Sequence, residues 1–357
     1  MLDVEGRVEH PAVFEIHRLY LVQTGIGQKR RCGQQDGRKQ ENAHGIPLKC
    51  RGYEYSEPKW RPGVAQGAAS VVSRAVSAYL EAKPRMEHPL DTKTRITREG
   101  IRLYEPEDFA GMHKAGKLAA EILDRVIPLV EPGVTTGELD AAIEAMVNEA
   151  GATSATIGYK GYEHASCISI NHVVCHGIPS DKKLKDGDIL NIDVTVIVDG
   201  WFGDTSRMFV AGKMPRKAER LVDVTHEALM LGIEAAKPGN TFGDIGFAIQ
   251  SFVEKNRMSV VRDFCGHGLG QVFHAPPNVL HYGRPGTGPI LQEGMFFTIE
   301  PMVNLGRPET KVLADDWTAV TRDKSLSAQF EHSIGITADG CEIFTLSPAG
   351  KFHPTYA

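Results

Sequence analysis

Hydrophobic residues recur at helical spacing in two long stretches of the chain, and each stretch leads into a second helix. In 107–129 and 216–236 the apolar positions fall three and four residues apart, which predicts amphipathic helices. A Pro-Gly pair follows each stretch, and then a capping signal, Thr135-x-x-Glu138 or Thr241-x-x-Asp244. The pattern therefore predicts two helix pairs of the same construction.

A third stretch, 189–207 (ILNIDVTVIVDGWFGDTSR), alternates between apolar and polar residues and predicts a β-hairpin. With Asp199-Gly200 as the turn, Thr195 pairs with Asp204, and Asp193 lies on the same face. Diagonal neighbours are about 7–8 Å apart, which allows two carboxylates to share cations about 3.5–4 Å apart. Taken alone, the hairpin favours the alternative of a solvent-facing Asp193 and an Asp204 that caps a helix.

The two helix pairs indicate an internal duplication. Residues 131–147 and 237–253 are identical at 7 of 17 aligned positions, at an offset of 106. Asp193 and Glu300 are 107 residues apart, almost the same offset. We therefore expect an α+β fold of two related halves, with antiparallel sheets covered by helices and carboxylates near a pseudo-twofold axis.

The remaining chain supplies further strands that carry polar residues. Residues 260–270 predict a strand that runs through the glycine-flanked His267, and 325–337 predict a last strand that holds Glu331 and His332. Pro301 lacks a backbone donor, so the strand over 295–303 should be interrupted just past Glu300.

Composition and charge exclude several classes of protein. The six cysteines form no CxxC pair, which favours a reducing cytoplasm, and no apolar run approaches the roughly 18 residues that span a membrane. The net charge of −5 divides into +5 over residues 1–85 and −10 over the rest. An acidic main body argues against DNA as a partner.

Residues 1–90 differ in composition from the rest and predict a poorly ordered basic extension, with a short helix over 64–82. We expect one catalytic domain over 91–350 and a tail over 351–357. One interpretation is that the extension contacts an anionic surface such as ribosomal RNA. The preferred interpretation is that the extension has no function; one form of this interpretation is that translation starts at Met86.

Five residues stand out as candidate metal ligands: Asp193, Asp204, His267, Glu300 and Glu331. Four carboxylates and one imidazole suit two divalent cations such as Co, Mn, Fe or Zn, and differ from a cysteine-rich structural zinc site. Each residue alone has an ordinary explanation. The combination favours a metal centre.

Six motifs occur in order: VVCHGIP (173–179), NIDVTV (191–196), GDTS (203–206), CGHGLGQVFH (265–274), FTIEPMV (297–303) and SLSAQFEHS (325–333). Over residues 90–350 they resemble the type I methionine aminopeptidases, metallopeptidases of the pita-bread fold. The 33 residues between His267 and Glu300 leave no room for the insertion of type II enzymes. The two cysteines of the extension cannot build a eukaryotic zinc-binding extension, so a bacterial-type enzyme is expected.

The resemblance implies a role for each ligand. Asp193 would hold one metal, Asp204 and Glu331 would bridge both, and His267 and Glu300 would complete the other. Two cations that share a water lower its pKa, so that hydroxide is available to attack the scissile carbonyl near neutral pH. Glu300 would relay the proton of that water.

The resemblance also implies residues that contact the substrate. His274 would hydrogen-bond the carbonyl oxygen, and His176 would contact the scissile nitrogen or stabilise the tetrahedral intermediate. The pocket for the methionine side chain would be lined by Tyr159, Tyr162, Cys167, Phe273 and Trp317, for which plain core packing is the alternative. Two places depart from the family pattern: Gln271 replaces an arginine, and Glu163-His164 stand where a proline is common.

The expected protein is a cytoplasmic, monomeric hydrolase that removes the initiator methionine from the N-terminal peptides of nascent proteins when the second residue is small. Two alternatives stay open. An X-Pro peptidase of the same fold would carry a large folded N-terminal domain, which residues 1–85 do not resemble. A binding-only relative would have lost its metals, and the five intact ligands argue against it.

Overall fold

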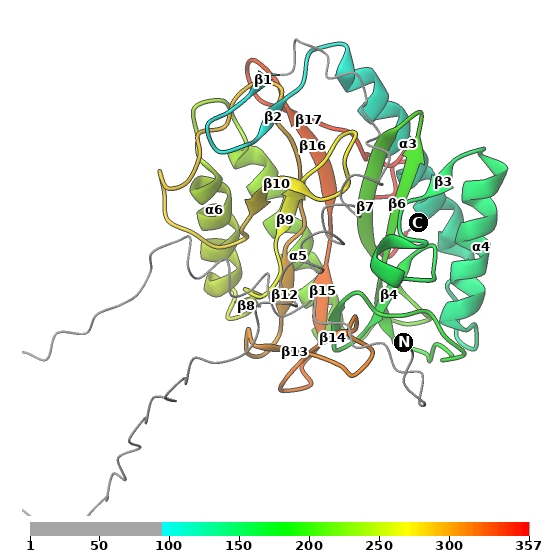
Figure 1. Ribbon diagram of the computed structural model, residues 1–357. Helices are drawn as coiled ribbons and strands as arrows, with labels where there is room; N and C mark the ends of the chain where they lie inside the picture. The colour runs from blue at the N-terminus through cyan, green and yellow to red at the C-terminus, as the bar shows by residue number, and fades with distance from the viewer. Residues whose placement is uncertain (1–94, 357) are drawn as a thin grey trace, which may run out of the picture. The chain divides into compact units, whose positions relative to one another are not determined.

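The computed structural model describes residues 95–356, which fold into antiparallel sheets flanked by helices (Figure 1). The predictions for residues 1–90, including the helix over 64–82, lie outside the described residues. The helices are α3 (Asp108–Val126), η1 (Ile127–Leu129), α4 (Thr136–Glu149), η2 (Tyr159–Gly161), α5 (Arg216–Ala235) and α6 (Phe242–Lys255). Among residues 95–356 no helix has the length and apolar character needed to cross a membrane.

The strands form five sheets of two to five strands each. They are β1 (Arg95–Ile96), β2 (Arg102–Leu103), β3 (Thr153–Ser154), β4 (Cys167–Ile170), β5 (Val173–Cys175), β6 (Ile189–Val198), β7 (Trp201–Val210), β8 (Ser259–Val260), β9 (Gly266–Gly268), β10 (Ala275–Val279), β11 (Phe296–Ile299), β12 (Met302–Asn304), β13 (Thr310–Val312), β14 (Ala319–Thr321), β15 (Ser327–Gln329), β16 (His332–Ile336) and β17 (Cys341–Ile343). Two of these sheets, β3-β6-β4 with β7 and β10-β9-β11-β16-β17, carry most of the candidate site.

The two helix pairs share their construction down to the backbone. Both predicted capping boxes are present, at Thr135 and at Thr241. The preceding glycines, Gly133 and Gly239, both have positive φ (98° and 88°), and each donates its N–H to a leucine carbonyl. A left-handed backbone favours glycine because it has no Cβ, which explains why this residue recurs in both halves. These repeated features support the duplication.

The predicted hairpin is confirmed in its register. Strands β6 and β7 pair Thr195 with Asp204 and Val198 with Trp201, and Asp193 lies opposite Ser206. Asp199 and Gly200 both have positive φ, 50° and 82°, as a tight two-residue hairpin turn requires. Asp193 and Asp204 therefore lie on the same face of the sheet.

The strands of the second half are shorter than predicted. The strand expected over 260–270 is wrong as one element, because β8 pairs with β12 and β9 pairs with β10 and β11 in another sheet. The strand expected over 325–337 is likewise divided into β15 and β16, and it is not the last, because β17 follows. The break at Pro301 is confirmed, and it leaves Glu300 between β11 and β12.

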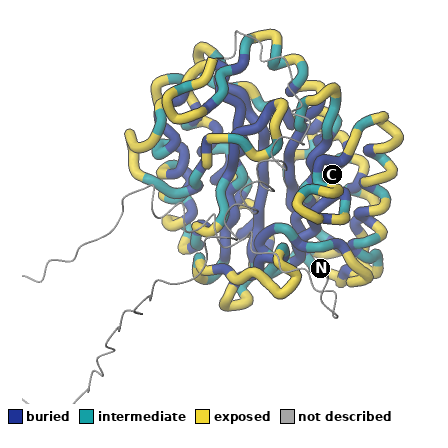
Figure 2. The backbone as a smooth tube through the Cα atoms, in the orientation of Figure 1, coloured by how far each residue is buried: buried dark blue, intermediate teal, exposed yellow. Residues whose placement is uncertain are grey.

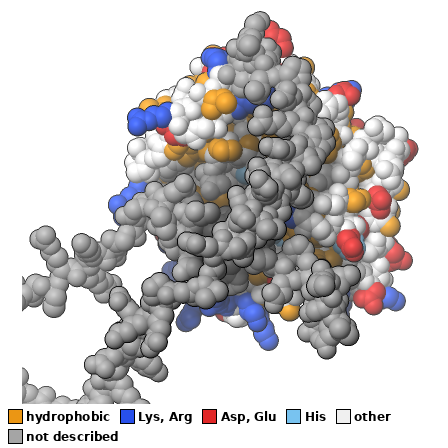
Figure 3. All heavy atoms as spheres, in the orientation of Figure 1, with side chains coloured by type: hydrophobic (Ala, Val, Ile, Leu, Met, Phe, Trp, Pro, Cys, Tyr) orange, Lys and Arg blue, Asp and Glu red, His pale blue; other side chains and the backbone are white. Residues whose placement is uncertain are grey.

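Two hydrophobic cores lie behind the strands. One packs α5 and α6 against strands of the second half, and the other packs α3 and α4 against β4 and β6. Buried residues therefore concentrate on the strands, and exposed residues concentrate on loops and outer helix faces (Figure 2). Acidic side chains are visible along the edge where α4 lies, and basic ones lie at the lower edge (Figure 3).

Candidate metal centre and active site

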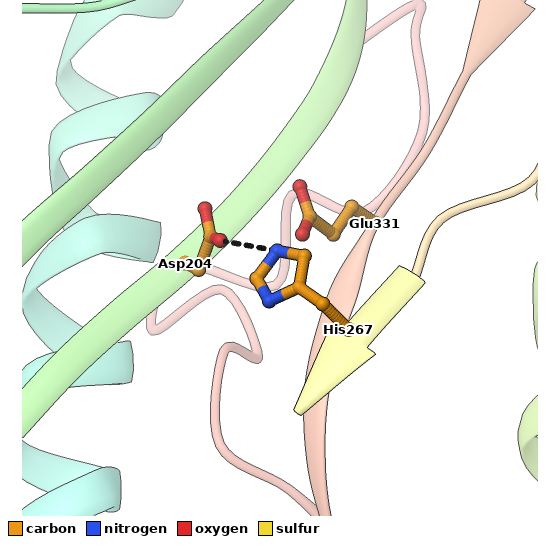
Figure 4. Close-up of side chains that lie close together, drawn as sticks. All are labelled: Asp204, His267 and Glu331. Carbon is orange, nitrogen blue, oxygen red and sulfur yellow. Dashed lines mark ion pairs between the residues drawn. The ribbon is translucent and has the colours of Figure 1, made fainter. Parts of the chain in front are cut away.

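Three of the predicted ligands converge from three separate segments. Asp204 comes from β7, His267 from β9, and Glu331 from the break between β15 and β16, and their side chains point toward one another (Figure 4). One ligand atom from each lies within 4.8 Å of the other two. The three residues are only 3%, 9% and 2% exposed. Such a set, largely shielded from water, can hold a metal ion.

Hydrogen bonds fix Asp204 on its strand. Thr195 Oγ1 donates to Asp204 Oδ1 at 2.7 Å, and Nε2 of His267 lies 3.4 Å from Asp204 Oδ2. Ser333 Oγ donates to the carbonyl oxygen of Asp204 at 2.6 Å. Because Ser333 belongs to β16, this bond joins the carboxylate's strand to the second half of the chain.

Glu300 is held beside this group by its own set of contacts. Thr298 Oγ1 donates to Oε1 at 2.8 Å, and Gln329 Nε2 donates to Oε2 at 3.3 Å. Oε1 lies 3.8 Å from His267 Nε2, and the backbone N–H of Glu300 donates to His281 Nε2 at 3.0 Å. The carboxylate is thereby aimed at the His267 side of the site.

Burial and neighbouring charges shift the pKa values of acidic groups in the site. Burial, and then the charges of Asp204 and Glu300, raise the pKa of Asp193 well above its ordinary value. Burial, and then the neighbouring carboxylates, also raise the pKa of Glu331, and burial raises the pKa of Glu300 to about 7 against the opposing effect of His267. Burial lowers the pKa of His267, but the hydrogen bond to Asp204 and the charge of Glu300 outweigh it and raise the pKa overall. Crowded carboxylates of this kind fit a site for positive charge.

The chemistry of the donors also fits a metal. Carboxylate oxygens with one imidazole nitrogen are ligands that Mn, Fe, Co and Zn accept in catalytic sites. Asp193 shares the inner face of the hairpin with Asp204, and Glu300 lies beside His267. Short distances thus join four of the five predicted ligands, Asp204, His267, Glu300 and Glu331. The fifth, Asp193, is placed beside them by its register on the hairpin and by the charges of Asp204 and Glu300, which raise its pKa.

His274 and His176 flank the group from two loops. The His274 ring centroid lies 4.1 Å from that of His267, 3.9 Å from that of Phe273 and 5.2 Å from that of Tyr159, although much of the residue faces outward. Burial of the ring among these neighbours, and then the charge of His267, lower the pKa of His274 below its ordinary value. Burial lowers the pKa of His176 to about 4. Both rings are therefore neutral near pH 7.

Both flanking histidines have positive φ, 59° for His274 and 55° for His176. Residues other than glycine adopt this region rarely, and they do so mostly where the surrounding structure imposes it. The backbone therefore holds these two rings in place at some conformational cost.

The predicted pocket residues form two aromatic groups. Tyr159 packs on Phe273 with ring centroids 5.0 Å apart, and Tyr162 packs on Trp317 at 4.9 Å. The Tyr162 hydroxyl contacts the buried thiol of Cys167, and burial raises the pKa of both groups far above their ordinary values. A neutral, buried thiol is unsuited to act as a nucleophile, so Cys167 fits the wall of a pocket.

Four further residues support the site, and they were not singled out from the sequence. Phe202 stacks on Phe273 at 5.4 Å, and Phe264 meets the His176 ring edge-on at 5.5 Å. His281 and Gln329 hold Glu300, as described above. The place of Phe202 on the predicted hairpin is the one local signal that could have found it. The roles of the other three depend on contacts between segments far apart in the sequence.

Comparison with known proteins agrees with this arrangement. Residues 110–338 match the family described as "Metallopeptidase family M24". A methionine aminopeptidase of Rickettsia prowazekii is 56% identical over 257 residues, which cover 72% of this chain and 99% of that protein, and one of Escherichia coli K12 is 55% identical over 248 residues, or 69% and 94%.

Solved structures show the same likeness. The crystal structure of methionine aminopeptidase from Rickettsia prowazekii has a TM-score of 0.68 and 57% identity, covering 69% of this chain and all (100%) of that one. The prolidase from Pyrococcus horikoshii has a TM-score of 0.54 at 23% identity, covering 68% and 63%, a likeness that concerns the fold alone.

Proposed function

The chain belongs to metallopeptidase family M24 and is a bacterial-type methionine aminopeptidase with the pita-bread fold, and we propose that five of its residues bind two divalent metal ions for that reaction. The enzyme removes the N-terminal initiator methionine. The observation that carries the metal proposal is the convergence of Asp204, His267 and Glu331 within 4.8 Å.

Each ligand has a proposed role, which its position supports. Asp204 and Glu331 face each other across the junction of the two halves and would contact both ions. His267 and Glu300, 3.8 Å apart, would complete one site, and Asp193 the other. When bound, the two ions lower the pKa of a water molecule and polarise the scissile carbonyl.

The residues around the ions supply the remaining chemistry. Glu300, held by Thr298 and Gln329, would take the proton of the attacking water and pass it toward the leaving amine. His274, a neutral ring beside His267, would donate a hydrogen bond to the carbonyl oxygen. His176 would contact the scissile nitrogen or the tetrahedral intermediate from the opposite loop.

The methionine side chain is proposed to lie among Tyr159, Tyr162, Cys167, Phe273 and Trp317. The two aromatic groups and the buried thiol support this, because rings and polarizable sulfur suit an unbranched thioether. We expect the second residue of the substrate to be small. We also expect a monomer that works in the cytoplasm on nascent chains, in contact with the ribosome in one interpretation, with Co, Mn, Fe or Zn as the metal.

The test compares two peptide classes with protein purified without added ions and then supplied with Co or Mn. Release of methionine from Met-Ala-Ser, with no cleavage of peptides that carry proline second, is expected. Metal analysis of the same preparation should give two ions per chain at saturation. Failure to cleave either peptide would overturn the metal proposal, and faster cleavage of the proline peptide would indicate an X-Pro peptidase instead.

A further inference from the structure

A buried carboxylate outside the metal centre binds the loop that carries the pocket residues. Asp140 lies on α4 and is 6% exposed. Its Oδ1 accepts hydrogen bonds from the backbone N–H of Ser166 at 2.9 Å and from Ser166 Oγ at 2.7 Å. Its Oδ2 lies 3.1 Å from Nδ1 of His164, whose ring is about one-third exposed. We define these three residues as the Asp140 bracket.

The Asp140 bracket contacts or adjoins two residues of the proposed pocket, Tyr162 and Cys167. The Tyr162 hydroxyl donates to the carbonyl oxygen of Ser166 at 2.9 Å, and the His164 ring meets the Tyr162 ring at 5.7 Å. Cys167 follows Ser166 directly and lies opposite Asp193 in the pairing of β4 with β6. A shift of Ser166 would therefore move the tyrosine and the thiol together.

Packing alone does not explain why polar groups occupy the buried positions of the Asp140 bracket. A carboxylate taken out of water is costly unless it is hydrogen-bonded, and the fully buried hydroxyl of Ser166 would also lose free energy without a partner. Apolar residues could fill the same space without those costs. What three directed hydrogen bonds add is a fixed geometry, which a pocket for one particular side chain needs.

We propose that Asp140 and His164 are positioning residues that hold the Tyr162–Cys167 wall and so set the preference of the pocket for an unbranched thioether side chain. This inference rests on the proposed function of that pocket. It also gives a role to His164, which stands at a position where the sequence departs from the family pattern.

The test uses three variants on the full chain. Asp140→Ala removes all three hydrogen bonds, whereas Asp140→Asn can keep them, because its oxygen accepts from Ser166 and its amide donates to the His164 ring. Glu144→Ala is the matched control, an exposed carboxylate one turn further along α4. We measure kcat and KM for Met-Ala-Ser and Leu-Ala-Ser, metal content, and the melting temperature.

For Asp140→Ala we expect the ratio of kcat/KM for the methionine peptide over the leucine peptide to fall about tenfold, mostly through KM, with metal content unchanged. Asp140→Asn should restore most of the ratio, and Glu144→Ala should match the wild type. An unchanged ratio in Asp140→Ala, which an equal loss for both peptides would also give, would overturn the proposal.

Two further measurements keep the test decisive. If Asp140→Ala does not fold, His164→Ala, which removes a partly exposed ring, should lower the ratio in the same direction by about threefold. If the wild type cleaves neither peptide, the proposed function fails, and calorimetric binding of free L-methionine against L-leucine to the same variants still reports on the bracket. Unchanged discrimination in that binding would overturn the inference.

Discussion

The backbone N–H of Glu331 donates a hydrogen bond to the carbonyl oxygen of Ser206 at 3.0 Å, across the junction between the two halves of the molecule. The carbonyl oxygen of Glu331 in turn accepts a bond from Thr205 Oγ1 at 2.8 Å. Both backbone groups of Glu331 are therefore tied to β7, the strand of Asp204. The proposed bridging carboxylates thus stand on paired backbone segments, which hold a constellation more tightly than loops do.

Glu331→Gln is expected to abolish most of the activity and to weaken metal uptake, because an amide carries no charge and offers one fewer ligand oxygen. The loss of turnover should exceed about 100-fold, the upper range for changes to residues that only support a ligand. Hydrolysis of Met-Ala-Ser and metal content after dialysis are the measurements. Glu293→Gln, at an exposed carboxylate, serves as the control. Near-normal turnover in Glu331→Gln would contradict the bridging role.

His274→Ala should behave differently, because this ring flanks the ligands without being one of them. We expect turnover to fall by about 10²-fold or more, as for removal of a positioned hydrogen-bond donor, with metal content about the same as in the wild type. Parallel kinetics and metal analysis separate the two quantities. A variant that loses its metal would show that His274 is a ligand.

The ion pair of Arg207 and Asp124 is expected to contribute strongly to stability. Nη1 of Arg207 lies 2.7 Å from Asp124 Oδ1, with the side chains only 4% and 10% exposed, and the guanidinium also donates to the carbonyl oxygens of Ala120 and Lys351. Asp124→Ala leaves a buried charge unpaired and should lower the free energy of unfolding by about 3–5 kcal/mol.

A neighbouring ion pair, which joins α3 to α4, offers the control for that experiment. Arg125 and Glu149 form an ion pair at 2.6 Å with both side chains substantially exposed. Glu149→Ala should change the free energy of unfolding by only about 0–1 kcal/mol in urea titrations. Equal effects of the two substitutions would contradict the importance assigned to burial.

Acid should destabilise the protein partly through His226. Burial, and then the charge of His353, lower the pKa of this ring to about 4, and it packs edge-on against Phe330 at 5.1 Å. The unfolded chain protonates histidine near pH 6.5, so the unfolded state binds the proton first. The stability contributed by the neutral ring is therefore present above about pH 6.5 and is lost as the pH falls through about 4.

His226→Gln cannot take up that proton. Its free energy of unfolding should decline less than that of the wild type between about pH 7 and about pH 4.5, measured by urea titration. His113→Gln, at an exposed histidine, is the control for effects that come from removing an imidazole as such. An identical decline in wild type and His226→Gln would contradict the assignment.

Local chemistry determined the features that the sequence predicts correctly. The hairpin follows from its two-residue alternation and the Asp199-Gly200 turn, and the capping boxes follow from residues three positions apart. The five candidate ligands can also be selected from the sequence by their residue types and motifs, and their binding of metal stays a prediction. The duplication follows from identities at a constant offset.

Tertiary structure decided the features that depend on partners distant in the chain. The strand predicted over 325–337 breaks at Glu331 because this residue bridges to Ser206 while β15 and β16 pair in different sheets. The support of Glu300 by His281 and the bonding of Ser166 by Asp140 likewise join segments with no shared local pattern. Periodicity reports which face of an element is buried, but only the folded chain decides which element covers that face.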